Sequence, residues 1–211
     1  MTIKKQKGRF ITFEGIDGAG KSTHIQFVSG MLTKAGIKNI ITREPGGTPL
    51  GEQLREILLH QKMSVATEAL LMIASRQEHL EQKILPALQQ GIWVISDRFA
   101  DASFAYQGAG KQFSWEKLEQ LETWVLGGTQ PDLTLLFDLP AEIAEERRSG
   151  THEPDKFEQE KNDFFLRAQA GYLKRAGTYP ERFKVIDSSQ DIAAIQSQIA
   201  DIIQPMIDAS L

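Results

Sequence analysis

The chain has 211 residues, of which 41% are hydrophobic and 25% charged, a balance typical of one soluble globular domain. Its formal net charge of −4 argues against a large nucleic-acid interface, which would require a basic face. The absence of cysteine excludes disulfides and thiolate metal sites and is typical of a reducing compartment. The lysines at positions 4, 5 and 7 precede no long apolar run. We therefore expect a cytoplasmic protein without a signal peptide or a membrane partner.

In chain order, short apolar runs alternate with longer segments of helical periodicity. The runs predict strands at residues 10–13, 40–42, 93–96, 133–138 and 184–187. Helices are expected at residues 21–35, 51–59, 67–90 and 114–126, and from about residues 141, 158 and 192. Pro86 should interrupt the long helix because it cannot donate to the hydrogen-bond ladder. Ser114 and Gly127 are typical of a helix start and a helix end.

This alternation favours an α/β fold in which right-handed crossovers join parallel strands. The strands are continuous apolar runs, as a sheet covered by helices on both faces requires. We therefore expect a three-layer sandwich of about five parallel strands, with residues 1–211 in a single domain. Ligands of such sheets bind beyond the carboxyl ends of the strands, so the segments that follow each strand are candidates for the site.

The segment after the first strand, GIDGAGKS at residues 15–22, fits the pattern G-x-x-x-x-G-K-[ST]. Its glycines let backbone N–H groups surround a polyphosphate, and the following helix N-terminus adds positive potential. Lys21 is expected to reach the β- and γ-phosphates, and Ser22 to bind Mg²⁺. The predicted nucleotide-binding residues are Gly15, Ile16, Asp17, Gly18, Ala19, Gly20, Lys21, Ser22 and Thr23. The base-reading N-K-x-D of GTPases is absent, which disfavours that class.

The third strand is followed by Asp97 and Arg98. An aspartate at the end of a strand beside a phosphate loop can hold the Mg²⁺ shell, directly or through Ser22 and water. The planar fork of Arg98 suits a phosphate, and Arg43 and Arg76 are further candidates for a second phosphate. Taken alone, each of these charges equally fits a surface ion pair or a solvated side chain.

Five segments together resemble bacterial thymidylate kinases over nearly the whole chain. They are FEGIDGAGKST at 13–23, TREPGGTPLGEQLR at 42–55, SDRFADASFAYQG at 96–108, PDLTLLFDLP at 131–140 and PDKFE at 154–158. The resemblance implies a P-loop kinase sandwich that transfers the γ-phosphate of ATP to dTMP, giving dTDP and ADP for dTTP synthesis, with Mg²⁺. It also implies a homodimer built on helices.

The resemblance further implies an acceptor site made of Asp17, Glu44, Arg55, Met72, Arg76, Arg98, Ser103, Tyr106 and Gln107. Asp17 and Glu44 correspond to acids that line the acceptor pocket, Asp17 near the sugar and the phosphate. Arg98 corresponds to the clamp on the acceptor phosphate. Met72 stands where family members often stack a phenylalanine on the base, and it equally fits plain core packing.

On the base side, the resemblance implies that Arg76 donates to a thymine carbonyl and that Ser103 and Gln107 make further polar contacts. Tyr106 corresponds to a wall under the sugar that disfavours a 2′-hydroxyl, and Arg55 to the pocket edge. The chemistry agrees, because thymine presents two carbonyl acceptors, one N–H donor and a methyl group.

The main departure from the family pattern concerns the lid. Gly18 occupies the P-loop position at which some relatives carry a catalytic arginine. Positive charge over the γ-phosphate is therefore expected from a short lid near residues 147–157. Beside Lys21, Arg98 and Asp17, the candidate catalytic residues are Arg147, Arg148 and Lys156. Taken singly, each of the three lid residues fits a solvated helix end better than a catalytic role.

Two other functions share these motifs. A kinase of the same architecture could act on another nucleoside monophosphate or on a deoxynucleoside, and a regulatory protein could bind the nucleotide without any acceptor. The histidines at positions 24, 60, 79 and 152 have no metal-ligand spacing, so only Mg²⁺ that arrives with ATP is expected. Leu80, Ile84 and Leu88 could face either a dimer partner or the core.

Overall fold

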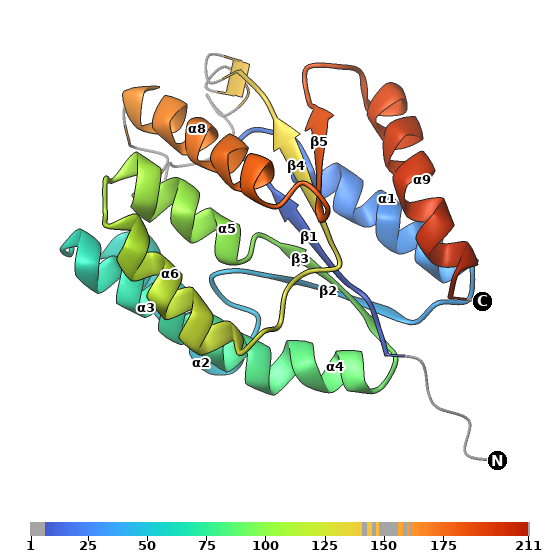
Figure 1. Ribbon diagram of the computed structural model, residues 1–211, viewed down its shortest axis with the longest axis horizontal. Coiled ribbons are helices and arrows are strands. Elements are labelled where there is room, and N and C mark those ends of the chain that lie inside the picture. The colour runs from blue at the N-terminus through green and yellow to red at the C-terminus, as the bar shows by residue number, and fades with distance from the viewer. Residues whose placement is uncertain are drawn as a thin grey trace.

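The computed structural model describes residues 7–140, 143–144, 147, 156–157, 160 and 162–210. Its centre is a sheet of five parallel strands in the order β2-β3-β1-β4-β5 (Figure 1). The strands are β1 (Phe10–Glu14), β2 (Asn39–Arg43), β3 (Trp93–Asp97), β4 (Leu133–Asp138) and β5 (Phe183–Asp187). All five predicted strands are confirmed, and the apolar runs of β1, β3 and β4 are the ones that a doubly covered sheet buries.

Helices cover both faces of the sheet. On one side lie α1 (Lys21–Lys34) and α9 (Ile192–Asp208), which pack against each other (Figure 1). The other side carries α3 (Val65–His79), α4 (Leu85–Gln89), α5 (Ala100–Ser103), α6 (Trp115–Leu126) and α8 (Asn162–Thr178), with α2 (Pro49–His60) beside α3. The three-layer sandwich is therefore confirmed.

The long helix expected at residues 67–90 is divided into three parts. It begins as α3, continues as the π-helical turn η1 (Leu80–Ile84) and ends as α4. Pro86 lies in the first turn of α4, the part of a helix that tolerates proline best. The N–H of Leu85 donates to the carbonyl of Leu80, so the wider π turn carries the ladder up to the proline.

Two short helical elements, α5 and η2, were not predicted. After α5 the chain forms the π-helical turn η2 (Phe104–Gly110), which packs against α8. Its sequence FAYQGAG is rich in small residues and glycine and has no helical periodicity. The helix expected from about residue 141 lies largely outside the described residues, and α8 begins four residues later than the expected start at 158.

The expected Ser114 cap is confirmed, since its side chain accepts from the N–H of Lys117, and Gly127 ends α6 in the left-handed region with φ 52°.

The core lies on both faces of the sheet. Leu80, Ile84 and Leu88 are buried in the core of this chain rather than presented to a partner. No helix of the described residues is long and apolar enough to cross a membrane.

Candidate active site

The phosphate loop runs between β1 and α1, at the carboxyl edge of the sheet. Gly15 has φ 139°, and a Cβ there would lie 2.4 Å from the carbonyl oxygen of Phe137, so only glycine fits. Gly20, with φ 81°, caps α1 without a side-chain hydrogen bond. The first N–H groups of α1 therefore keep their donors for an anion, as a phosphate cradle requires.

Lys21 opens α1 and is buried beneath this loop. Its Nζ donates to the carbonyl oxygens of Gly15 and Ile16, at 3.2 Å each. Burial lowers the pKa of Lys21 and the charge of Arg98 adds to this effect, while nearby carboxylates, first Asp97, oppose it. An added phosphate would raise this pKa and offer the ammonium group a stronger acceptor than two carbonyls.

Ser22 and Asp97 line one cavity of about 370 Å³ together with the phosphate loop. Oδ1 of Asp97 is buried and has no hydrogen-bond partner among the described residues. A buried carboxylate oxygen without a donor is chemically suited to a cation. The chemistry of this pair is compatible with Mg²⁺, and the metal-binding role stays a prediction.

Arg98 joins the phosphate loop to the acceptor side. Its backbone has φ 69°, an unusual conformation for a residue other than glycine and one that concentrates at functional sites. Its Nη2 donates to Oδ1 of Asp17 at 2.6 Å and to the hydroxyl of Tyr106 at 2.9 Å. Its Nη1 donates to the hydroxyl of Tyr172 at 2.8 Å and to the carbonyl of Gly15 at 2.9 Å.

Asp17 carries a full negative charge in this arrangement. Burial acts to raise the pKa of Asp17, but the charges of Arg98 and Lys21 and the hydroxyl of Tyr106 hold it well below its usual range. The Tyr106 hydroxyl donates to Oδ2 at 2.7 Å. The guanidinium of Arg98 also lies 4.7 Å from the centre of the Tyr106 ring. These three side chains therefore form one rigid unit between the two halves of the site.

A second cavity lies beside this unit. Of the nine residues predicted for the acceptor site, seven line it: Asp17, Glu44, Arg55, Met72, Arg98, Tyr106 and Gln107. Four of its lining residues, namely Asp17, Glu44, Arg55 and Arg98, also line the cavity of the phosphate loop. The two cavities are therefore adjacent and share a charged wall.

The other two predicted acceptor residues are not among those that line the cavity. Arg76 is buried and donates through Nε to Glu44 at 2.8 Å, and through Nη2 to Ser103 at 3.1 Å and the carbonyl of Phe99 at 2.9 Å. Its Nη1 has no hydrogen-bond partner among the described residues. Arg76 thus fixes Glu44 and Ser103, while its Nη1 bonds to neither of them.

His79 supports the site although the sequence analysis assigned it no role. Its Nδ1 lies 3.0 Å from Oε1 of Glu44 and its Nε2 lies 2.7 Å from Oγ1 of Thr42. A carboxylate acceptor favours the tautomer with the proton on Nδ1. Arg76 and His79 are three residues apart, so they lie on one face of α3, and both contact Glu44. This spacing is the signal in the sequence that could have indicated the role of His79.

Two of the three predicted lid cations, Arg147 and Lys156, lie among the described residues, and their surroundings differ. Arg147 lines the cavity of the phosphate loop, and its Nη1 donates to the carbonyl of Ser188 at 3.2 Å. Lys156 instead pairs with Glu68 at 2.8 Å, on the acceptor side. Arg148 lies outside the described residues, as does most of the predicted lid at 147–157.

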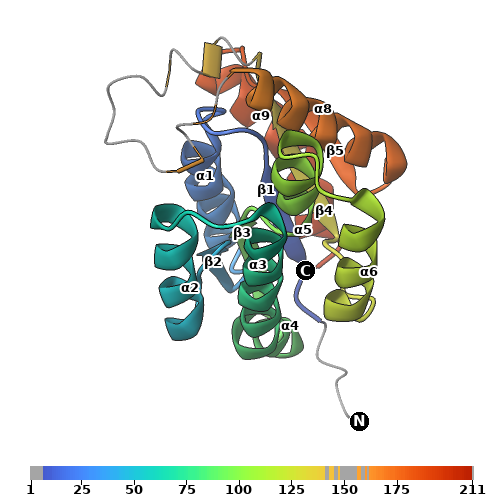
Figure 2. The same ribbon diagram turned by 90° about the vertical axis from the view of Figure 1, so that its left-hand side faces the viewer.

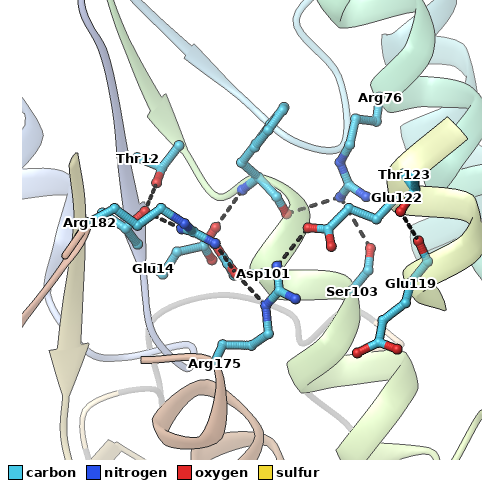
Figure 3. Close-up of polar contacts among 12 residues, drawn as sticks. Thr12, Glu14, Arg76, Asp101, Ser103, Glu119, Glu122, Thr123, Arg175 and Arg182 are labelled. Carbon is cyan, nitrogen blue, oxygen red and sulfur yellow. Dashed lines mark hydrogen bonds and ion pairs between the residues drawn. The ribbon is translucent and has the colours of Figure 1, made fainter. Parts of the chain in front are cut away.

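Behind the acceptor side lies a buried ionic network that the sequence did not reveal (Figure 3). Asp101 on α5 accepts from Arg175 at 2.7 Å and from Arg182 at 2.7 and 2.9 Å. Arg175 also donates to Glu122 of α6 at 2.6 Å. The network ties α5, α6 and α8 to the residue before β5, and Asp101 follows Arg98 by three positions in the chain.

Glu14 at the end of β1 belongs to the same buried region. Its Oε1 accepts from the N–H of Phe99 at 2.7 Å, next to Arg98 in the chain. Burial, followed by the charge of Asp101, raises the pKa of Glu14 to about 8, and Arg98 and hydrogen bonds oppose the shift. The carboxyl group is therefore protonated at neutral pH.

A parallel sheet with a phosphate loop and an adjacent second cavity defines the class of P-loop nucleotide kinases. The family model for thymidylate kinase matches residues 13–199. The thymidylate kinase of Cupriavidus pinatubonensis is 59% identical over 202 residues, which cover 95% of this chain and 100% of the relative. That of Janthinobacterium sp. is 59% identical over 93% of this chain and 96% of its own.

Solved structures agree with these relatives. The crystal structure of thymidylate kinase from Ehrlichia chaffeensis superimposes with a TM-score of 0.78 at 33% identity. The match covers 94% of this chain and 99% of that chain. The chain belongs to the thymidylate kinase family.

Proposed function

We infer that the protein phosphorylates dTMP to dTDP with ATP as the phosphate donor, the activity of its family. The observation that carries the assignment of the site is the charged wall shared by the two cavities, with Asp17 and Arg98 at its centre. Phosphoryl transfer requires two phosphates held in line with their charge neutralised, and adjacent cavities that share two arginines, Arg55 and Arg98, meet this requirement.

On the donor side, the phosphate loop and Lys21 hold the β- and γ-phosphates of ATP. The free N–H groups of α1 and the ammonium group supply fixed positive charge, which costs no reorganisation during transfer. Ser22 and Asp97 hold Mg²⁺, which neutralises charge on the phosphates when it is bound. The unpartnered Oδ1 of Asp97 supports this assignment.

On the acceptor side, Arg98 binds the phosphate of dTMP. Its guanidinium is already oriented by Asp17, Tyr106 and Tyr172, so binding costs little conformational entropy. Asp17 accepts a hydrogen bond from the 3′-hydroxyl of the sugar. The Tyr106 ring forms the wall under the sugar and leaves no room for a 2′-hydroxyl.

The thymine base lies between Met72 and the polar groups of α3, α5 and η2 in this proposal. Nη1 of Arg76 donates to a thymine carbonyl, and Ser103 and Gln107 provide further polar contacts. Arg55 closes the edge of the pocket, where its Nη1 also donates to the carbonyl of Pro45 at 3.0 Å. Met72 is 6% exposed and offers a flexible apolar contact to the ring in place of a stacking aromatic.

Positive charge over the γ-phosphate comes from the lid. Arg147 already lies on the phosphate cavity, and it is the first candidate for this role. Arg148 and Lys156 are the other two. Closure of such a segment excludes water from the reacting phosphates and strengthens every electrostatic contact there.

The functional unit is a cytoplasmic homodimer in this proposal. Large apolar side chains are exposed on three helices: Leu50 of α2 by 47%, Leu70 of α3 by 56% and Trp124 of α6 by 78%. These helices pack side by side, α2 on α3 and α3 on α6, and are turned toward the viewer in Figure 2. Large apolar side chains exposed on adjacent helices favour a protein partner. Light scattering after size exclusion, on the wild type and on Trp124→Glu, tests the dimer.

A panel of acceptors tests the function. ADP release with Mg²⁺-ATP is measured with dTMP, dUMP, UMP, CMP, AMP, GMP and thymidine. We expect the highest kcat/KM for dTMP, and a loss of at least about 100-fold in Arg98→Ala because a charge-stabilising donor is removed. A higher kcat/KM for another acceptor would overturn the base-pocket assignments, and ATP binding without any transfer would favour a regulatory protein.

A further inference from the structure

The side-chain amide of Gln107 has one end bonded and one end free. Gln107 is fully buried on η2 and lines the acceptor cavity. Its Nε2 donates to Oε1 of Glu68 at 2.9 Å, whereas its Oε1 has no hydrogen-bond partner among the described residues. A buried carbonyl oxygen without a donor is destabilising, so its retention beside a cavity indicates a ligand that donates to it.

Glu68 determines which end of this amide is free. The side chain lies on α3 and is 1% exposed. Burial acts to raise the pKa of Glu68, but hydrogen bonds from Lys156, Gln107 and Lys111 outweigh it and hold the pKa below its usual value. The group is therefore ionised at neutral pH. An ionised carboxylate accepts hydrogen bonds and donates none, so it can hold only the NH₂ end of a glutamine.

The two oxygens of Glu68 have separate partners. Lys111 and Lys156 both bond to Oε2, at 2.9 and 2.8 Å. Oε1 is left to Gln107. The lysines thus hold the carboxylate in one rotamer, and the carboxylate in turn holds the amide in one orientation.

We propose that Glu68 is a positioning residue for base specificity, which orients Gln107 so that its carbonyl oxygen accepts the N3–H of the acceptor base. The inference rests on the proposed function, because it requires that the base bind in this cavity. Thymine and uracil carry a hydrogen on N3, whereas N3 of cytosine is an acceptor. An acceptor placed against Oε1 leaves two buried groups unpaired, so dCMP is rejected.

The variant Glu68→Gln tests this role through the same lysines. Both ammonium groups donate, so the remaining oxygen of the new amide is held at the former Oε2 position. Its NH₂ group then faces Gln107, which must turn its own oxygen toward residue 68. The amide of Gln107 presents Nε2 to the base, which suits N3 of cytosine and opposes N3–H of thymine.

The measurement is kcat/KM for dTMP, dUMP and dCMP in the wild type and in Glu68→Gln. We expect the ratio of dTMP to dCMP to fall by at least about tenfold, the effect of one buried hydrogen bond. The ratio of dTMP to dUMP is an internal control, because both bases carry N3–H, and it should stay within about twofold. A general loss of structure would change both ratios or neither.

Lys111→Met is the matched control variant. It removes one of the two lysines and keeps the carboxylate on Gln107, so its ratio of dTMP to dCMP should equal that of the wild type. Glu68→Gln combined with Lys111→Met restores the local charge balance while Lys156 still holds the oxygen. This double variant keeps the test decisive if the single variant does not fold.

Each outcome separates the two claims. Failure of the wild type to phosphorylate dTMP would reject the proposed function itself. Phosphorylation of dTMP by the wild type, with an unchanged ratio of dTMP to dCMP in the folded Glu68→Gln variants, would reject the role of Glu68 alone. A fall of the ratio in Lys111→Met as large as in Glu68→Gln would also reject it, because charge rather than amide orientation would then set specificity.

Discussion

The hydroxyl of Tyr106 donates to the Asp17 carboxylate across 2.7 Å, which fixes a side chain of η2 to the phosphate loop. The two residues are 89 positions apart in the chain. The same carboxylate holds Arg98, so the orientation of the acceptor-phosphate clamp depends on the aromatic wall of the sugar pocket. This geometry couples recognition of the sugar to the placement of the phosphate.

Tyr106→Ala should relax the selection against a 2′-hydroxyl. Removal of the ring opens space under the sugar, so kcat/KM for ribothymidylate should rise relative to dTMP by about tenfold. Tyr106→Phe keeps the ring and loses only the hydroxyl, and it should retain the preference for the deoxy sugar. Equal ratios in the wild type and both variants would show that this ring is not the wall.

The lid prediction concerns kcat. Alanine at Arg147 should lower kcat at least about tenfold, because a cation on the phosphate cavity stabilises charge in the transition state. Alanine at Arg148 and at Lys156 is measured in parallel by steady-state kinetics. If all three variants keep kcat within tenfold of the wild type, the lid does not supply the charge.

The ionic network behind the site should contribute strongly to stability. Arg175→Met leaves the buried Glu122 without a partner and removes one of the three hydrogen bonds to Asp101, so the free energy of unfolding should fall by about 3–5 kcal/mol. Arg9→Met removes an exposed ion pair with Asp132 and should cost less than about 1 kcal/mol. Urea denaturation of both variants checks this, and equal costs would contradict the account.

The raised pKa of Glu14 should make the stability of the protein depend on pH. Its folded pKa of about 8 exceeds its ordinary value of 4.5, so the folded state holds a proton that the unfolded chain has lost between these values. The free energy of unfolding should therefore fall as pH rises through this window, by at most about 1.4 kcal/mol per unit. The neighbouring groups are Asp101, Arg98 and Tyr172.

Glu14→Gln places a neutral group of the same shape at this position. The variant should lose this fall in stability and exceed the wild type at pH 9, as measured by urea denaturation at several pH values. A pH profile identical to that of the wild type would show that Glu14 is ionised throughout.

The sheet and the phosphate loop could be predicted from the sequence because each depends on a local pattern. Buried strands are continuous apolar runs, and the phosphate loop requires glycines at fixed spacing. The turn η2 could not be predicted, since it is stabilised by its packing on α8 rather than by local propensity. The sequence indicated an interruption of the long helix near Pro86, but it did not indicate that the interruption is the π-helical turn η1.

In the candidate site, too, residues that belong to a local motif could be predicted, whereas contacts between distant positions could not. Motifs indicated the residues of the cavity wall, but no motif indicates which charges are buried together. Asp101 and Arg175 are 74 positions apart, and a lone charge on a helix is usually solvated. The role of Glu68 was hidden for the same reason, because its partner Gln107 lies 39 positions away on the unpredicted turn.

The most direct test of the two-cavity account is inhibition by adenosine and thymidine joined through a chain of phosphates. A compound that occupies both cavities across the shared wall of Asp17 and Arg98 must exclude both substrates. Steady-state kinetics should therefore show competitive inhibition against ATP and against dTMP. Inhibition that is competitive against ATP but not against dTMP would show that the second cavity is not the acceptor site.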